Sequence, residues 1–174
     1  MTEITAEFVR QILQYDAQTG EMRWRASKGR RRRVKAGDLA GALRHDGYRF
    51  VGIKGKRYPA HRLAWLYVHG VWPTGQIDHI DTNPENNAIA NLREATNAQN
   101  QFNKPKRVDN TSGRKGVFWR RNRKKWFAQI KVHGKQIYLG SFDEVEAAAV
   151  AYQEAAEKLQ GEFAHRGVAY WAIR

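Results

Sequence analysis

Four polar side chains in the middle of the sequence have types and spacing that suit chemistry at a phosphate: Asp78, His79, Asn91 and Asn100. Asp78 and Asn100 bring carboxylate and amide oxygens, the hard ligands that Mg²⁺ and Mn²⁺ prefer in proteins. His79 brings an imidazole that can take a proton from water near neutral pH. A divalent ion beside this base can stabilise charge on a phosphate and on its leaving oxygen. These residues therefore predict metal-assisted attack on a phosphate ester.

Three predicted elements must bring these side chains together. Residues 77–80 and 89–93 are predicted to form short strands, and residues 81–87 between them have the composition of a turn-rich loop. Thr96 is a suitable N-cap for a helix that runs to about Asn103. Because two strands and one helix carry the four polar residues, their side chains can converge on one site.

The residues before this segment predict further helices and strands. Apolar residues at near-helical spacing indicate an amphipathic helix over residues 4–15, and residues 21–25 are predicted to form a strand. Residues 42–58 indicate short strands joined by two hairpin turns. A second helix is predicted to begin at Pro59 and to end at Gly70, since proline suits a first helical turn and glycine suits a C-terminal cap.

The charge of the chain points to nucleic acid as its partner. The 174 residues include 31 Lys and Arg against 17 Asp and Glu, a formal net charge of +14. Basic residues concentrate in residues 104–135 and in residues 1–57. Residues 1–57 include a run of four arginines, Arg30, Arg31, Arg32 and Arg33. Small and strongly basic proteins most often bind polyanions, so we expect two basic surfaces that flank the central polar segment.

The composition also excludes several classes of protein. The sequence has no cysteine, which rules out disulfides, thiolate zinc sites and cysteine nucleophiles and is typical of a reducing compartment. It has no run of 18 apolar residues, and its first residues lack the basic and apolar regions of a secretory signal. We therefore expect a cytoplasmic protein that does not bind a membrane.

Two sequence segments within residues 58–103 carry a family resemblance: YPAHRLAWLYVHG and IDHIDTNPENNAIANLREATNAQN. Together they resemble the HNH endonucleases, in particular the homing enzymes of phages and introns, which have a ββα-metal fold. The resemblance implies that His79 is the general base and that Asp78 and Asn100 bind a divalent ion, Mg²⁺ or Mn²⁺. It implies that Asn91 braces the loop and the orientation of His79. The last motif residue is Asn rather than His, as in the homing subset.

A second resemblance covers residues 113–160, which follow a linker-like segment at 104–113. Its anchors are KGV, WFAQI, IYLGSF, EAAAVAY and LQGEFA. These motifs resemble the DNA-binding domain of the plant ethylene-response-factor (apetala-type) proteins. The resemblance implies a three-stranded antiparallel sheet packed on one helix, with the sheet laid in the major groove of DNA. The residue pattern independently predicts three strands and one helix, over residues 116–119, 126–132, 136–139 and 142–159.

The predicted DNA contacts come from three parts of the chain. Matching the C-terminal motifs position by position implies contacts by Lys115, Arg120, Arg123, Lys125, Gln129, Lys131, Gln136 and Tyr138. Several of these differ in type from the plant residues, so the plant target sequence does not transfer. The arginine run at residues 30–33 is a further predicted contact. The pair His61-Arg62 also recurs in the HNH family, and for this pair a phosphate contact and a packing role are both open.

We therefore expect an α+β protein in four parts. These are a basic N-terminal helix with a β-rich arm (1–57), a ββα-metal HNH core (58–103), a linker (104–113) and a DNA-binding domain with a C-terminal tail (114–174). The main hypothesis is a metal-dependent, site-specific endonuclease that nicks one strand of double-stranded DNA as a monomer, with a homodimer left open. A non-catalytic DNA-binding regulator and a nuclease for RNA are the alternatives. If a phage encodes the chain, its compartment is the cytoplasm of a bacterial host.

Overall fold

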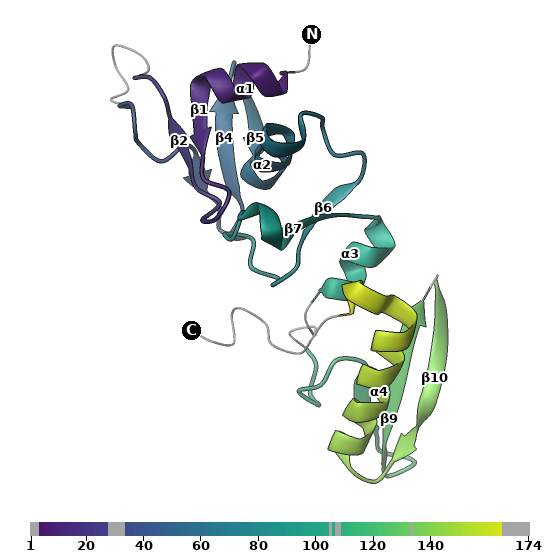
Figure 1. Ribbon diagram of the computed structural model, residues 1–174. Helices are drawn as coiled ribbons and strands as arrows, with labels where there is room; N and C mark the ends of the chain where they lie inside the picture. The colour runs from purple at the N-terminus through teal and green to yellow at the C-terminus, as the bar shows by residue number, and fades with distance from the viewer. Residues whose placement is uncertain (1–3, 28–33, 105, 107–108, 133, 165–174) are drawn as a thin grey trace. The chain divides into compact units, whose positions relative to one another are not determined.

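The computed structural model describes residues 4–27, 34–104, 106, 109–132 and 134–164 (Figure 1). The chain forms two compact units, Met1–Ala95 and Thr96–Arg174. Both contain helices and small antiparallel sheets, which confirms the predicted α+β class. The boundary between the units falls inside the segment 58–103, which the sequence predicts to be one core. None of the helices in the described ranges is long and apolar enough to cross a membrane.

The N-terminal unit combines helices with three small antiparallel sheets. Its elements are α1 (Ala6–Ile12), β1 (Leu13–Tyr15), β2 (Met22–Trp24), β3 (Ala42–Leu43), β4 (Arg49–Ile53), β5 (Lys56–Pro59), α2 (Ala60–His69), β6 (Gln76–His79), the 3₁₀ helix η1 (Ile89–Asn91) and β7 (Leu92–Ala95). The strands pair as β1–β2, as β3–β4–β5 and as β6–β7. The two predicted hairpins between residues 42 and 58 are confirmed by this pairing.

The first helix is shorter than the predicted helix over residues 4–15. Thr5 caps its N-terminus by accepting a hydrogen bond from the main chain of Phe8, and the helix ends at Ile12. Leu13–Tyr15 form strand β1 instead, with the first and third side chains buried and the middle one exposed. Pairing with β2 buries both apolar side chains, and this tertiary contact outweighs the helical spacing of the sequence.

The strand predicted over residues 89–93 also begins later than predicted. Ile89–Asn91 form a 3₁₀ turn, and pairing with β6 begins only at Leu92. The predicted helix that follows β5 is confirmed as α2, which ends where Gly70 adopts a left-handed conformation with φ of 80°. A glycine at this position closes the helix without the steric cost of a Cβ atom.

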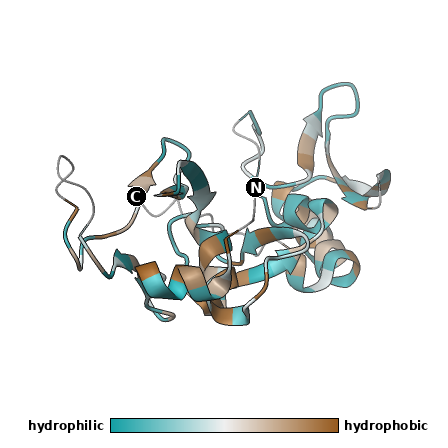
Figure 2. Ribbon diagram, turned by 90° about the horizontal axis from the view of Figure 1, so that it is seen from above, coloured by the Kyte–Doolittle hydropathy of each residue, from teal (hydrophilic) through white to brown (hydrophobic). Residues whose placement is uncertain are grey.

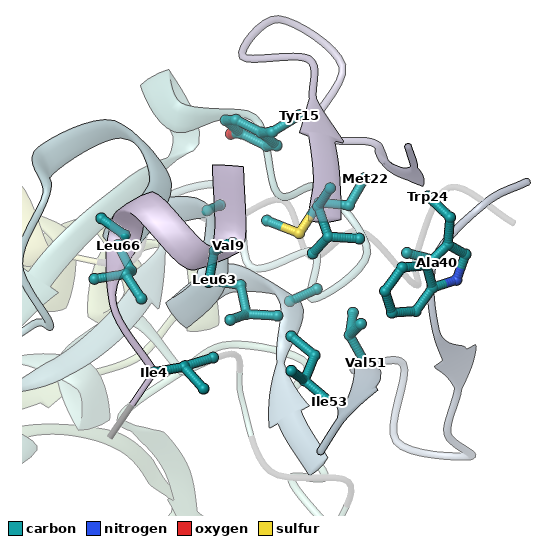
Figure 3. Close-up of a cluster of buried hydrophobic side chains, with 14 of the residues drawn as sticks. Ile4, Val9, Tyr15, Met22, Trp24, Ala40, Val51, Ile53, Leu63 and Leu66 are labelled. Atoms are coloured by element: carbon teal, nitrogen blue, oxygen red, sulfur yellow. The ribbon is translucent and has the colours of Figure 1, made fainter. Parts of the chain in front are cut away.

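One hydrophobic core holds the N-terminal unit together (Figure 3). Val9 of α1, Val51 of β4 and Leu63 of α2 are all fully buried, and Leu66 is nearly so. Each buried aliphatic side chain of this kind contributes about 1.5–3 kcal/mol by leaving water. These residues come from both sides of residue 57, so the N-terminal arm and the segment with the Asp-His motif share one core.

The C-terminal unit has the architecture that its resemblance implies. Its elements are α3 (Asn97–Asn103), β8 (Val117–Arg120), β9 (Lys125–Val132), β10 (Lys135–Phe142), α4 (Val145–Gln160) and the 3₁₀ helix η2 (Gly161–Phe163). The strands form an antiparallel sheet in the order β8–β9–β10, and α4 packs along it (Figure 1). The helix begins at Val145 rather than at residue 142, because Phe142 still pairs with Trp126 in the sheet.

Residue alternation along β9 separates the two faces of this sheet. Ala128, Ile130 and Val132 are buried and pack with Tyr152 of α4. Hydrophobic and hydrophilic stretches interchange along the helices and strands of the protein (Figure 2). Gly116 lets the helix approach closely, because a Cβ atom there would overlap the Tyr152 ring and the backbone φ is +70°. The opposite face carries Lys125, Phe127, Gln129 and Lys131, which are half-buried or exposed.

Candidate active site and nucleic-acid interface

The hairpin of β6 and β7 positions the Asp-His motif. Asp78 and His79 are the last two residues of β6 and lie opposite Arg93 and Leu92 of β7. Both motif side chains are buried, with exposed fractions of 4% and 5%. A buried carboxylate and a buried imidazole need partners inside the protein, and each of them has one.

Arg93 is the partner of Asp78. Its Nε and Nη2 atoms both donate hydrogen bonds to Oδ2 of the carboxylate, at 2.9 and 2.8 Å. The two residues face each other across the strand pair, and their charges compensate in this buried position. Sequence spacing alone does not identify Arg93 as a site residue, because only the strand register, which begins at Leu92, brings it opposite Asp78.

Asn87 is the partner of His79. The Nε2 atom of the imidazole lies 3.1 Å from Oδ1 of Asn87, while the amide nitrogen of Asn87 donates to the main-chain oxygen of Glu85. Because an amide oxygen only accepts, Nε2 carries the ring proton and the lone pair resides on Nδ1. Burial lowers the pKa of His79, opposed by the Asn87 hydrogen bond and by the charges of Asp81 and Asp78. The ring is therefore neutral near pH 7.

The side chain of Asn91 forms hydrogen bonds within the loop between β6 and β7. Its amide nitrogen donates to Oδ1 of Asp81 at 2.9 Å and to the main-chain oxygen of Asn86 at 2.8 Å. Its side-chain oxygen accepts a hydrogen bond from the main-chain nitrogen of Asp81 at 3.0 Å. This single side chain thus joins the two ends of the loop that carries Asn87.

Two more rings surround His79. The ring of His61 lies edge-on with its centroid 5.2 Å from that of His79, and the ring of Tyr48 lies 5.5 Å from His61 and 5.9 Å from His79. Burial, and then electrostatic interaction with His79 and Arg62, lower the pKa of His61 to about 3. His61 is therefore a neutral neighbour of His79 rather than a cation. Tyr48 comes from the turn of the β3–β4 hairpin, and no motif in the sequence identifies it as a neighbour of His79.

The other member of the His61-Arg62 pair has main-chain partners. Arg62 donates from Nη1 to the oxygen of Gly75 at 3.0 Å and from Nη2 to the oxygen of Pro73 at 3.2 Å. Its guanidinium also lies 5.9 Å from the Trp72 ring centroid. These contacts hold the segment between α2 and β6, so they favour the packing role that the sequence left open.

Asn100 lies on α3, in the C-terminal unit. The helix begins with the predicted N-cap: the Thr96 hydroxyl accepts from the main chain of Gln99, whose side chain accepts from the main chain of Thr96. In the described ranges, His, Asp and Glu side chains do not form a cluster of three that could hold a metal ion. Asp78 and Asn100 fit Mg²⁺ or Mn²⁺ by their donor chemistry, since such ions take one or two protein oxygens together with waters and phosphate oxygens.

The exposed sheet face of the C-terminal unit gathers most of the predicted DNA contacts. A shallow depression on it is lined by Phe118, Arg120, Arg123, Lys125, Phe127, Gln129, Tyr138 and Ser141. A second depression is lined by Gln129, Lys131 and Gln136 together with Lys106, Asp109, Asn110, Lys115, Gly116 and Tyr152. The Arg120 guanidinium lies 4.7 Å from the Phe127 ring centroid, which holds this cation over the face. Lys125 pairs with Asp143 at 3.0 Å.

Lys115 differs from the other predicted contacts. Its ammonium donates to the main-chain oxygens of Phe102 and Lys104, both at 2.6 Å, and so binds the C-terminal end of α3. Burial lowers the pKa of Lys115 to about 8. The predicted contacts Arg30, Arg31, Arg32 and Arg33 lie outside the described residues.

Comparison with known proteins shows two families along the chain. Residues 58–102 match the HNH endonuclease family, and residues 112–162 match the AP2 domain. Protein 3.8 of Escherichia phage T7 is 40% identical over 105 residues, which cover 60% of this chain and 86% of that protein. An uncharacterised HNH endonuclease of Acanthamoeba polyphaga mimivirus is 37% identical over 106 residues, which cover 60% of this chain and only 54% of the viral protein. No solved structure matches significantly.

Proposed function

The chain belongs to the HNH endonucleases of phage type and carries an AP2-like domain, and from this premise we propose that it is a metal-dependent, site-specific DNA endonuclease of the homing kind. Membership of the HNH family makes it a nuclease, and its two domains make DNA its partner. The observation that carries the finer proposal is the imidazole of His79, held in one tautomer by Asn87 beside the buried carboxylate of Asp78.

His79 acts as the general base in this proposal. Its Nδ1 atom takes a proton from the attacking water while the Nε2–H group stays bound to Asn87. The lowered pKa keeps the ring neutral before the reaction, and the charges of Asp81 and Asp78 stabilise the imidazolium that forms. A positioned base of this kind contributes roughly 10²–10⁴-fold to the rate.

Asp78 and Asn100 are the proposed ligands of the divalent ion. When bound, Mg²⁺ or Mn²⁺ would stabilise negative charge on the phosphate and on the leaving oxygen. Arg93 holds Oδ2 of Asp78 through two hydrogen bonds, so we assign it the orientation of this carboxylate. Asn91 holds the loop that carries Asn87, and through it the imidazole of His79.

The exposed face of β8, β9 and β10 is the proposed DNA-docking surface. Its proposed contacts are Arg120, Arg123, Lys125, Gln129, Lys131, Gln136 and Tyr138, which line the two depressions described above. Lys115 we assign instead to holding α3, because its ammonium binds two carbonyls there. The arginines at 30–33 are proposed to contact phosphates, which position a protein on DNA without specifying bases.

A single chain is proposed to nick one strand. It carries one Asp78-His79 pair, and one such pair can align one water with one scissile phosphate at a time. Cutting both strands would need a second copy or a second binding event. Supercoiled plasmid should therefore accumulate as open circles before any linear product forms.

The test is cleavage of supercoiled plasmid with Mg²⁺ or Mn²⁺, with and without EDTA. We expect EDTA to stop cleavage, and His79→Ala to slow it roughly 10²–10⁴-fold while DNA affinity stays within a few-fold. His69→Ala is the matched control, because His69 is an exposed imidazole at the end of α2. This variant should cleave DNA like the wild type. DNA binding without cleavage by the wild-type chain would instead support the non-catalytic regulator.

A further inference from the structure

The ring of Tyr48 packs against the imidazole of His79 and is more exposed than that imidazole. The three rings of Tyr48, His61 and His79 contact one another edge-on, and they differ in exposure. His79 is 5% exposed and His61 is half-buried, whereas Tyr48 is 36% exposed. Tyr48 is therefore the most exposed ring of this cluster.

The β3–β4 hairpin holds Tyr48 against the loop that follows β6. The turn closes with main-chain hydrogen bonds between Arg44 and Tyr48 and between Gly47 and Arg44, at 2.9 and 3.0 Å. A Cβ atom at Gly47 would lie only 2.6 Å from the Pro84 side chain, so the hairpin tip and the loop are in close contact. Tyr48 is thus a built part of the site and not a surface residue that faces it by chance.

The Tyr48 hydroxyl is available to a substrate. In the described parts of the chain, no group forms a hydrogen bond with it. Burial, and then the charges of Asp46 and Asp78, raise the pKa of Tyr48, so the phenol keeps its proton. A neutral O–H donor on a ring that contacts His79 suits an anionic oxygen.

We infer that Tyr48 is a further catalytic residue, whose hydroxyl donates a hydrogen bond to a non-bridging oxygen of the scissile phosphate. This inference rests on the proposed function of the site. Donation to an oxygen that gains charge during attack stabilises the transition state more than the bound substrate. The ring contributes separately, by packing against His61 and His79. His61, which stays neutral, supports the two rings without competing for the phosphate.

The variant Tyr48→Phe separates these two contributions, because it removes only the hydroxyl. We expect the single-turnover rate on supercoiled plasmid at saturating protein to fall about 10- to 100-fold, as for loss of one hydrogen bond to a charged group. DNA affinity and thermal stability should remain those of the wild type. Tyr48→Ala should be as slow as Tyr48→Phe or slower. The matched control is Tyr58→Phe, which changes a half-buried tyrosine stacked on Trp72 in the same unit.

Two outcomes would overturn the inference. In the first, Tyr48→Phe cleaves at the wild-type rate while Tyr48→Ala is slow, which would leave only the packing of the ring. In the second, Tyr48→Phe weakens DNA binding and leaves the saturated rate unchanged. Failure of the proposed function has a different signature, since His79→Ala would then cleave like the wild type. The small diester bis(p-nitrophenyl) phosphate, which needs no target sequence, provides a second substrate for the same comparison.

Discussion

The proposed functional side chains of the two units differ in their exposure to solvent. In the N-terminal unit, Asp78, His79 and Asn87 are at most 5% exposed, and each has a partner within the protein. In the C-terminal unit, the sheet face presents Arg120 and Lys131 to solvent. The first arrangement restricts the orientation and charge of a few groups, and the second keeps many cations available to a polyanion.

The difference follows from what each task requires. A general base acts only from one position and in one tautomer, so its neighbours must hold it before the substrate arrives. Phosphate contacts act mainly by charge and by releasing counterions from DNA, so they need access more than precision. The comparison predicts that changes around His79 alter the rate of cleavage, while changes on the sheet face alter affinity.

The largest expected effect is on stability and is confined to the C-terminal unit. Gly116→Ala should lower the free energy of unfolding of this unit by about 3 kcal/mol, because the new Cβ atom would overlap the Tyr152 ring and the backbone φ is +70°. Gly134→Ala is the matched control: its φ is +79°, but nothing lies within 4 Å of the new atom. Thermal melting followed by near-UV circular dichroism should show a smaller loss, of about 1 kcal/mol, for the control. Equal losses would contradict the close packing of α4 on the sheet.

The next effect concerns the orientation of the base. Asn87→Ala removes the acceptor that holds Nε2 of His79, so cleavage at saturating protein should slow by about 10- to 100-fold. DNA affinity should be unchanged, because Asn87 is only 3% exposed. Single-turnover cleavage and a gel-shift titration measure the two quantities separately. A loss of DNA affinity with a normal cleavage rate would contradict the prediction that changes around His79 alter the rate and not the affinity.

A third prediction concerns acid sensitivity. The pKa of His61 is lowered to about 3 in the folded protein, whereas an unfolded histidine titrates near its ordinary value of about 6.5. Between these two values the unfolded chain binds a proton that the folded chain does not. The free energy of unfolding of the N-terminal unit should therefore fall as the pH falls, by up to about 1.4 kcal/mol per pH unit from this group.

The variant His61→Gln tests this directly. Glutamine does not titrate, so denaturant unfolding of the variant between pH 6.5 and pH 4 should depend less on pH than that of the wild type. His79, whose pKa is also lowered by burial, should leave a residual slope. An unchanged slope in the variant would show that His61 is protonated in the folded protein.

The smallest effect belongs to a single cation of the sheet face. Lys131→Ala should weaken binding to duplex DNA a few-fold and reduce the slope of log affinity against log salt by about 0.9, the value for one phosphate contact. Lys158→Ala on α4 is the matched control, since it removes an equal charge away from this face. Fluorescence anisotropy at several salt concentrations measures both slopes. Identical slopes for the two variants would contradict a contact between DNA and Lys131 on this face.

Local patterns in the sequence predict many elements of the fold. The predicted helix that ends at Gly70 appears as α2, which starts one residue later than predicted, and the helix capped by Thr96 appears with its predicted ends, because capping depends on residues within one turn of the chain. The alternation along β9 correctly separates its buried face from its exposed face. The strand at Leu13–Tyr15 is missed, because its conformation depends on pairing with β2, which lies further along the chain.

Some residues of the candidate site can also be identified from the sequence, whereas others can be identified only from the structure. Motif spacing and residue type identify Asp78, His79 and Asn91, and the structure places these three around one hairpin. Neither type nor spacing identifies Arg93 as the partner of Asp78, or Tyr48 as a neighbour of His79. Those contacts depend on the register of β7 and on the position of the β3–β4 hairpin.

The sequence by itself determines the chemistry available to this protein: a carboxylate next to an imidazole, amides at set distances, and a basic sheet with one apolar face. The tertiary structure decides which of these groups meet and in what state. It makes His79 neutral through burial, holds its tautomer through Asn87 and leaves Tyr48 partly exposed beside His79. The physical reason is range, since local propensity acts over a few residues, whereas burial and strand register join segments that the sequence keeps far apart.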